Sequence, residues 1–177
     1  MAVLIEGISV VLRKDVIEQK YPGGIAQYEK DSPNRTFCAD QYLTAIRFMM
    51  PKDVQHFVQN LEQHGMKLLS GNEFDEIAIV DMLSGATTRC DWLSFAKKFD
   101  GISVCWLAGT DLAEVAVPMG WEFETSLSMK NSFVSNQEAN KKVRFLRSEG
   151  KVDVYLDLGT GKEVYVGRPF NEERTDT

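Results

Sequence analysis

The chain has 177 residues, of which 44% are hydrophobic and 26% are charged, and its formal net charge is −6 at neutral pH. This length and composition are typical of one globular domain with a substantial core. The negative charge argues against nucleic acid and against an anionic membrane surface as partners. No run of eighteen apolar residues occurs in the sequence, so we expect no membrane span.

The start of the chain and its cysteines indicate the cellular compartment in which the protein is expected. Met1–Ile5 carry no charged leader and are followed at once by Glu6, so no signal peptide is visible. Cys38, Cys90 and Cys105 are odd in number, widely spaced and without any Cys-x-x-Cys pair. We therefore predict reduced thiols and a cytoplasmic protein.

The first third of the chain predicts strands and short helices. Residues 3–12 form an apolar run rich in valine and isoleucine, which favours a buried strand. A short helix over residues 15–21 and a turn of helix near 25–29 are expected next. The alternation over residues 42–50 predicts a strand, and a helix beginning at Ala39 is an open alternative.

Residues 51–64 give the clearest helix of the chain. Pro51 suits the first turn, and Asp53 favours the positive end of the helix dipole. Gly65 is well placed to end the helix in a left-handed conformation. The stripe expected to face the core has helical spacing and consists of Val54, Phe57, Val58 and Leu61.

A second main helix is predicted over about 136–149. Ser135 and Glu138 have the spacing of a capping box at its start, and Gly150 would stop it. Its apolar stripe would consist of Ala139, Val143 and Leu146.

The remaining segments predict strands. They are residues 76–82, 91–98, 102–108 and 114–124, with a last hairpin of residues 152–158 and 163–167. Asp100-Gly101 favours a two-residue turn. That turn would place Phe95 opposite Trp106 and leave both hairpin faces apolar, so we expect a sheet covered on both sides or covered by a partner.

Taken together, these patterns indicate an α+β fold with a mostly antiparallel or mixed sheet and two main helices. We expect a single compact domain over residues 1–177, with a frayed polar tail at 171–177.

A four-residue segment, Gly-Ile-Ser-Val, occurs at 7–10 and again at 101–104. A tandem duplication would give two decayed related halves, residues 1–98 and 99–170. Strands followed by turn residues also resemble one another in unrelated chains, so both interpretations stay open.

The order predicted over residues 43–108, one strand, one helix and three strands, resembles the vicinal-oxygen-chelate superfamily. The resemblance covers about two fifths of the chain. The metal ligands of that superfamily, typically histidine, glutamate or glutamine on strands, have no obvious set here. The two histidines, His56 and His64, lie about 12 Å apart along the predicted helix, too far to share a zinc ion. We therefore expect no metal site and no cofactor.

Carboxylates and tryptophans supply the candidate site. Cys90-Asp91-Trp92 is the most interesting local cluster, and all three tryptophans fall within thirty residues. Aromatic side chains line pockets and interfaces as well as cores. The candidate ligand-binding residues are Asp81, Cys90, Asp91, Trp92, Trp106 and Glu122, and no residue is assigned a catalytic role.

Two hypotheses about function follow. The first is a binding or interaction protein that self-associates and holds a small ligand or a protein partner on a Trp-rich sheet. The alternative is a small carboxylate-based enzyme, a hydrolase, isomerase or lyase, which requires Asp81, Asp91 and Glu122 to converge in a cleft. A third candidate, an inhibitory partner of immunity type that captures a basic protein, fits the small acidic chain.

Overall fold

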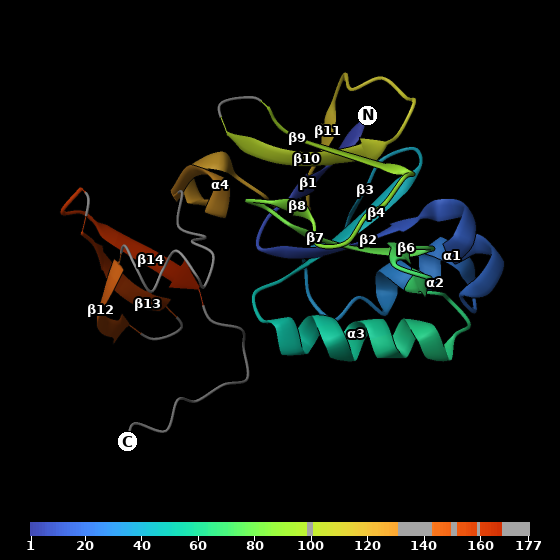
Figure 1. Ribbon diagram of the computed structural model, residues 1–177, viewed down its shortest axis with the longest axis horizontal. Helices are drawn as coiled ribbons and strands as arrows, with labels where there is room; N and C mark the ends of the chain where they lie inside the picture. Colours follow the sequence, from blue (N-terminus) through green and yellow to red (C-terminus); the bar gives the residue numbers. More distant parts are fainter. Residues whose placement is uncertain (99–100, 131–142, 150–151, 159, 168–177) are drawn as a thin grey trace.

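The structure is a computed structural model that describes residues 1–98, 101–130, 143–149, 152–158 and 160–167. It has the predicted α+β architecture, with antiparallel and mixed sheets. In Figure 1 a five-stranded sheet lies between a four-stranded sheet on one side and helices on the other. The tail at 171–177 lies outside the described residues.

The five-stranded sheet is antiparallel throughout. In spatial order its strands are β3 (Cys38–Ala39), β4 (Leu43–Phe48), β2 (Ile8–Arg13), β7 (Ile77–Asp81) and β8 (Gly85–Ala86). The strands predicted over 42–50 and 76–82 are thus confirmed as β4 and β7. Ile8 pairs with both Phe48 and Asp81, so these three side chains share one face of the sheet.

The four-stranded sheet packs against the first. In spatial order its strands are β11 (Val115–Ala116), β1 (Ala2–Ile5), β10 (Ile102–Leu107) and β9 (Leu93–Lys98). Strand β1 pairs antiparallel with β10 and parallel with β11. The core between the two sheets includes the fully buried side chains of Val3, Ile5, Val11, Ala78, Val80 and Cys105.

Glu6 and Gly7 carry the chain from one sheet into the other. The single strand predicted over 3–12 is divided here into β1 and β2. Gly7 has a φ of 58°, and a Cβ at this position would lie 2.7 Å from the carbonyl oxygen of Phe48. Only glycine tolerates both this conformation and this contact, so the bend is fixed locally although the apolar run continues through it.

Three helices cover the other face of the five-stranded sheet (Figure 1). They are α1 (Lys14–Lys20), α2 (Gly24–Lys30) and α3 (Pro51–Gln63), each within one residue of its predicted range. Their common core with the sheet includes Val10, Leu12, Ile17, Val58, Leu61 and Ile77. None of the helices in the described part of the chain is long and apolar enough to cross a membrane.

Two smaller sheets complete the strands of the described residues. A small hairpin is formed by β5 (Leu69–Ser70) and β6 (Glu73–Phe74). A three-stranded antiparallel sheet is formed by β12 (Val143–Glu149), β13 (Val152–Asp157) and β14 (Glu163–Gly167). The predicted C-terminal hairpin is confirmed as β13 and β14.

The prediction of a second main helix over 136–149 is wrong for the residues of that range that the structure describes. Residues 143–149 form strand β12, and residues 136–142 lie outside the described residues. Pairing with β13 outweighs the helical spacing of a few apolar residues. It places Phe145 opposite Tyr155, with ring centroids 5.6 Å apart in an edge-on arrangement.

The predicted hairpin forms from β9 and β10, but its register differs by one residue. Lys98 pairs with Ile102, so three residues connect the strands and not two. An Asp-Gly pair is compatible with both connections. Phe95 therefore pairs with Cys105, at the core between the sheets, and not with Trp106.

The long strand predicted over 114–124 is largely wrong. Only β11 forms, because Pro118 lacks an amide donor and Gly120, at a φ of 77°, turns the chain. Two short helices follow, η1 (Phe123–Thr125) and α4 (Leu127–Lys130).

The two Gly-Ile-Ser-Val segments both begin a strand after a glycine of positive φ, Gly7 or Gly101. Strand β2 is central in the larger sheet and leads into α1, whereas β10 lies in the smaller sheet and leads into a turn. The similarity is therefore local, and two decayed halves remain a hypothesis. The strands of residues 43–108 fall into both sheets, so they do not form the repeat unit that the vicinal-oxygen-chelate resemblance implied.

Candidate functional site

A groove runs along α3, where the helix leaves part of the five-stranded sheet uncovered. Its volume is about 480 Å³, within the range of small-molecule sites. The helix side is lined by Pro51, Val54, Gln55, Val58, Gln59 and Glu62. The sheet side is lined by Ile8, Leu68, Ile79, Asp81 and Thr87.

The floor of the groove is apolar. Ile77 and Ile79 lie on the same face of β7, two residues apart. Ile77 is fully buried among the helices, whereas Ile79 is only partly buried, as is Ile8 at the start of β2. Partly exposed isoleucines on a core-forming face indicate an apolar surface suited to contact with another molecule.

Asp81 is the polar group fixed most firmly in the groove. Its Oδ1 accepts hydrogen bonds from the backbone amides of Leu83 (2.8 Å) and Ser84 (3.2 Å). Its Oδ2 has no hydrogen-bond partner among the described residues. The carboxylate is therefore held in place with one oxygen available to a ligand.

The lining contains no histidine, cysteine, lysine or arginine. Its one hydroxyl group, on Thr87, donates to the backbone carbonyl oxygen of Ile79 at 3.2 Å. Neither an activated nucleophile nor a paired acid and base is therefore present among these residues.

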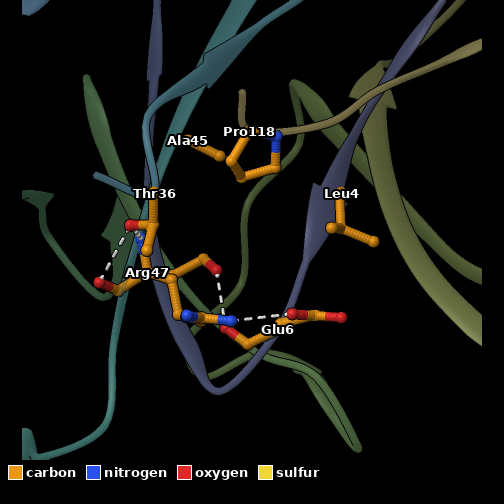
Figure 2. Close-up of a pocket in the computed structure, with 7 residues that line it drawn as sticks. Leu4, Glu6, Thr36, Ala45, Arg47 and Pro118 are labelled. Carbon is orange, nitrogen blue, oxygen red and sulfur yellow. Dashed lines mark hydrogen bonds and ion pairs between the residues drawn. The ribbon is translucent and has the colours of Figure 1, made fainter. Parts of the chain in front are cut away.

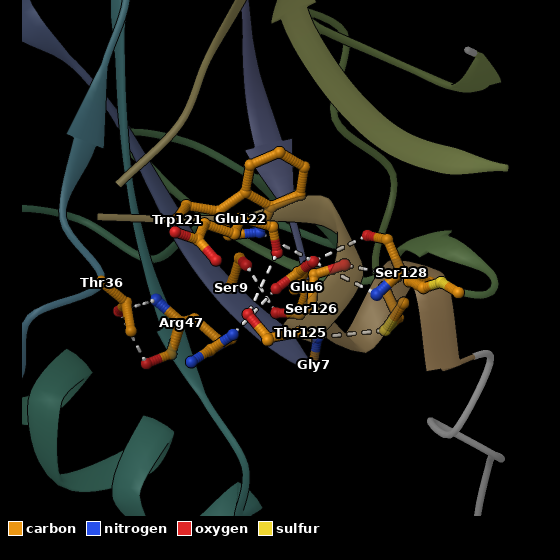
Figure 3. A network of polar contacts seen from close by, with 12 residues as sticks. Glu6, Gly7, Ser9, Thr36, Arg47, Trp121, Glu122, Thr125, Ser126 and Ser128 are labelled. Carbon is orange, nitrogen blue, oxygen red and sulfur yellow. Dashed lines mark hydrogen bonds and ion pairs between the residues drawn. The ribbon is translucent and has the colours of Figure 1, made fainter. Parts of the chain in front are cut away.

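Outside the groove, a cluster of polar side chains is centred on Glu6 (Figure 3). The side chain is 2% exposed and lies at the bend between β1 and β2. One carboxylate oxygen pairs with the guanidinium of Arg47 at 2.8 Å. The other accepts from the indole N–H of Trp121 (3.2 Å) and from both the amide (3.2 Å) and the hydroxyl (2.7 Å) of Ser128.

This cluster joins three separate parts of the chain: the β1–β2 bend, strand β4 and the segment around η1 and α4. Both carboxylate oxygens of Glu6 are engaged, and the Ser9 hydroxyl donates to the Glu6 carbonyl oxygen at 3.1 Å. A buried carboxylate with this many donors is typical of a structural link.

A recess adjoins the cluster on the Arg47 side (Figure 2). It is lined by Leu4, Glu6, Ser9, Thr36, Ala45, Arg47 and Pro118, and its volume is about 10 Å³. Such a space holds about one water molecule. It is too small for a substrate, so the groove along α3 is the stronger candidate site.

The predicted residues Asp91 and Trp92 lie where the chain enters β9. Trp92 donates its indole N–H to the carbonyl oxygen of Asp75 at 2.6 Å, and the guanidinium of Arg13 lies 5.4 Å from its ring centroid. Asp91 is exposed and pairs with Arg89 at 3.1 Å. These contacts anchor the segment to the fold.

The three cysteines are free thiols. Burial raises the pKa of Cys90 to about 11 and that of Cys38 to about 12, and it also raises the pKa of Cys105. Raised thiol pKa values leave little thiolate at neutral pH, so none of the three is an activated nucleophile.

The structure does not gather the predicted residues into one site. Trp106 lies on β10 opposite Ser94, and Glu122 is exposed beyond β11. Within the described chain, the only tryptophan ring in contact with another aromatic ring is Trp121, whose centroid is 6.4 Å from that of Phe123. Of the predicted set, Asp81 alone lines the groove.

The carboxylates required by the enzyme hypothesis are also separate. Asp81 faces the groove, Asp91 pairs with Arg89, and Glu122 is exposed. No three histidine, cysteine or carboxylate side chains of the described residues gather closely enough to hold a metal ion.

Comparison with protein-family models, curated proteins and solved structures found no match to this chain. Sequence reasoning identified Asp81 as a candidate site residue and placed Val54 and Val58 on the core-facing stripe of the helix, but it missed Ile8 and Ile79. One available signal was the alternation in β7, which puts Asp81 on the same face as two isoleucines.

Proposed function

We propose that the protein binds a small, mainly apolar molecule in the groove between α3 and the β7 end of the five-stranded sheet. The observation that carries this proposal is the groove itself, about 480 Å³ in volume, with Ile8 and Ile79 partly exposed at its floor. Pockets of this size and composition commonly bind ligands. The binding class is the first of the hypotheses that the sequence raised, at a different place from the Trp-rich sheet.

The test uses a matched pair of variants on the exposed side of α3. Gln59 lines the groove, whereas Gln63, one helical turn later, does not. We expect the wild type to enhance the fluorescence of the neutral dye Nile red. Gln59→Trp should fill part of the groove and weaken dye binding about tenfold or more, and Gln63→Trp should leave it unchanged.

Both variants should unfold at nearly the same temperature as the wild type, because both positions are exposed. If the wild type leaves Nile red fluorescence unchanged, or if both variants weaken dye binding equally, the proposed site is wrong.

Self-association and a cytoplasmic location are part of the same proposal, and both come from the sequence. Three free cysteines are consistent with a reducing compartment. Light scattering coupled to size exclusion measures the mass directly. A mass of 20.0 kDa at every concentration would identify a monomer and contradict self-association.

A further inference from the structure

We propose that the ligand of this groove is an elongated apolar molecule with a cationic amine at one end, and that Asp81 holds the amine. This inference rests on the proposed binding function and adds the chemical class of the ligand.

The charge of the lining favours a cationic ligand. Its only ionisable residues are Glu62 and Asp81, and both are acidic. Two carboxylates without a cation oppose an anionic ligand, such as a fatty acid, and favour a positive group. The net charge of the whole chain, −6, acts in the same direction at longer range.

The geometry of Asp81 also favours a cationic group. Two backbone amides bind Oδ1 and thereby fix the orientation of the carboxylate. Oδ2 has no partner among the described residues, and the side chain is partly buried. A carboxylate oxygen that is held in place and partly shielded from water forms its strongest hydrogen bond with a charged donor, and an ammonium group is such a donor.

The shape of the groove favours an elongated ligand. Its helix wall extends from Pro51 to Glu62, roughly 16 Å at 1.5 Å per residue. Asp81 lies near the Pro51 end, because it pairs with Ile8, which also pairs with Phe48 just before α3. An amine at Asp81 would thus leave the remaining apolar length for a hydrocarbon chain.

The test compares three ligands with the same chain and different heads: dodecylamine, dodecan-1-ol and dodecanoate. Each ligand is titrated against Nile red bound to the wild type, at concentrations below its critical micelle concentration. We expect dodecylamine to bind about tenfold more tightly than dodecan-1-ol, the effect of one charge-assisted hydrogen bond, and dodecanoate to bind most weakly. The advantage of the amine should shrink with added salt.

Asp81→Asn should abolish the preference for the amine while dodecan-1-ol still binds. Asp91→Asn is the matched control, because it removes the same charge at an exposed position outside the groove. It should retain the preference. If Asp81→Asn does not fold, the three ligands and the salt series on the wild type decide the question.

The outcomes separate the two proposals. Equal binding of amine and alcohol, or tighter binding of dodecanoate, overturns the amine assignment and leaves the groove as a binding site. A loss of preference in both variants assigns the effect to overall charge and also overturns the role of Asp81. Failure of all three ligands to displace the dye contradicts the proposed function itself.

Discussion

The two faces of the five-stranded sheet are closed to different degrees. On the face toward the smaller sheet, Val11, Ala78 and Val80 are all fully buried. On the face toward the helices, burial is complete at Ile77 but only partial at Ile79, two residues along the same strand. One sheet thus supplies both a closed core and the partly open face at which we propose that a ligand binds.

The difference follows from what covers each face. A second sheet extends across the strands, and the Glu6 cluster ties the bend between the sheets to the segment around α4. Helices are narrower than a sheet, so three of them leave the β7 end open beside α3. The closed face should therefore be the more sensitive of the two to substitution.

The largest expected effect is at the Glu6 cluster. Glu6→Ala removes the acceptor of Arg47, Trp121 and Ser128 and leaves a partly buried guanidinium without its partner. We expect the free energy of unfolding to fall by about 3–5 kcal/mol in urea denaturation. Arg89→Ala breaks two exposed ion pairs, with Asp91 and Glu73, and serves as the control, with an expected loss of about 1 kcal/mol or less. Equal losses would show that the cluster is not a structural link.

The next effect compares two isoleucines on one strand. Ile77→Ala should lower the free energy of unfolding by about 2–5 kcal/mol, because it leaves a cavity under the helices. Ile79→Ala should cost about 1 kcal/mol, since its side chain is already partly exposed, and it should also weaken Nile red binding. Thermal unfolding and dye titration measure both. A larger loss at Ile79 would contradict the distinction between covered and open parts of this face.

A smaller effect is expected at the bend. Gly7→Ala combines positive φ with a Cβ 2.7 Å from the carbonyl oxygen of Phe48. Gly65→Ala also has positive φ, but no atom lies within 4 Å of its Cβ. We expect a loss of about 2–3 kcal/mol at Gly7 and about 1 kcal/mol at Gly65. Similar losses in urea denaturation would mean that the contact with Phe48 relaxes without strain.

The smallest effect concerns Cys90, the partly exposed thiol. Burial raises its pKa to about 11, so alkylation by iodoacetamide should keep accelerating beyond pH 9 and reach half its limit near pH 11. The raised pKa also makes stability depend on pH. The fold favours the protonated thiol, so the contribution of Cys90 to the free energy of unfolding is complete below pH 9 and is lost as the pH rises through 11. Cys90→Ser should remove the reaction. A midpoint near that of a free thiol would contradict the burial of Cys90.

The parts of the fold that follow from local patterns could be predicted. The spacing of Val54, Val58 and Leu61 predicted α3, and alternation predicted β4. The helix predicted over 136–149 failed because its outcome depends on a pairing that the pattern of its own segment does not contain. Residues 143–149 carry helical spacing, yet their pairing with β13 decides the outcome.

The candidate site was only partly predictable for the same reason. Asp81 could be named from the sequence as a candidate carboxylate, but a groove exists only where helices leave a sheet uncovered. Glu6 was overlooked although a charged residue inside the apolar run over 3–12 is an unusual feature. Its partners Trp121 and Ser128 lie more than a hundred residues away, beyond the reach of any local pattern.

The bend at Glu6 and Gly7 also has a consequence for the order in which the chain acquires its structure. Strand β2 finds its partners within the first half of the chain, whereas Val3 of β1 pairs with Cys105, about 100 residues later. During synthesis β1 therefore emerges early and has no β10 to pair with until residues 102–107 have been made. Pairing between such distant residues is slow, so we expect the N-terminal strand to join the fold late.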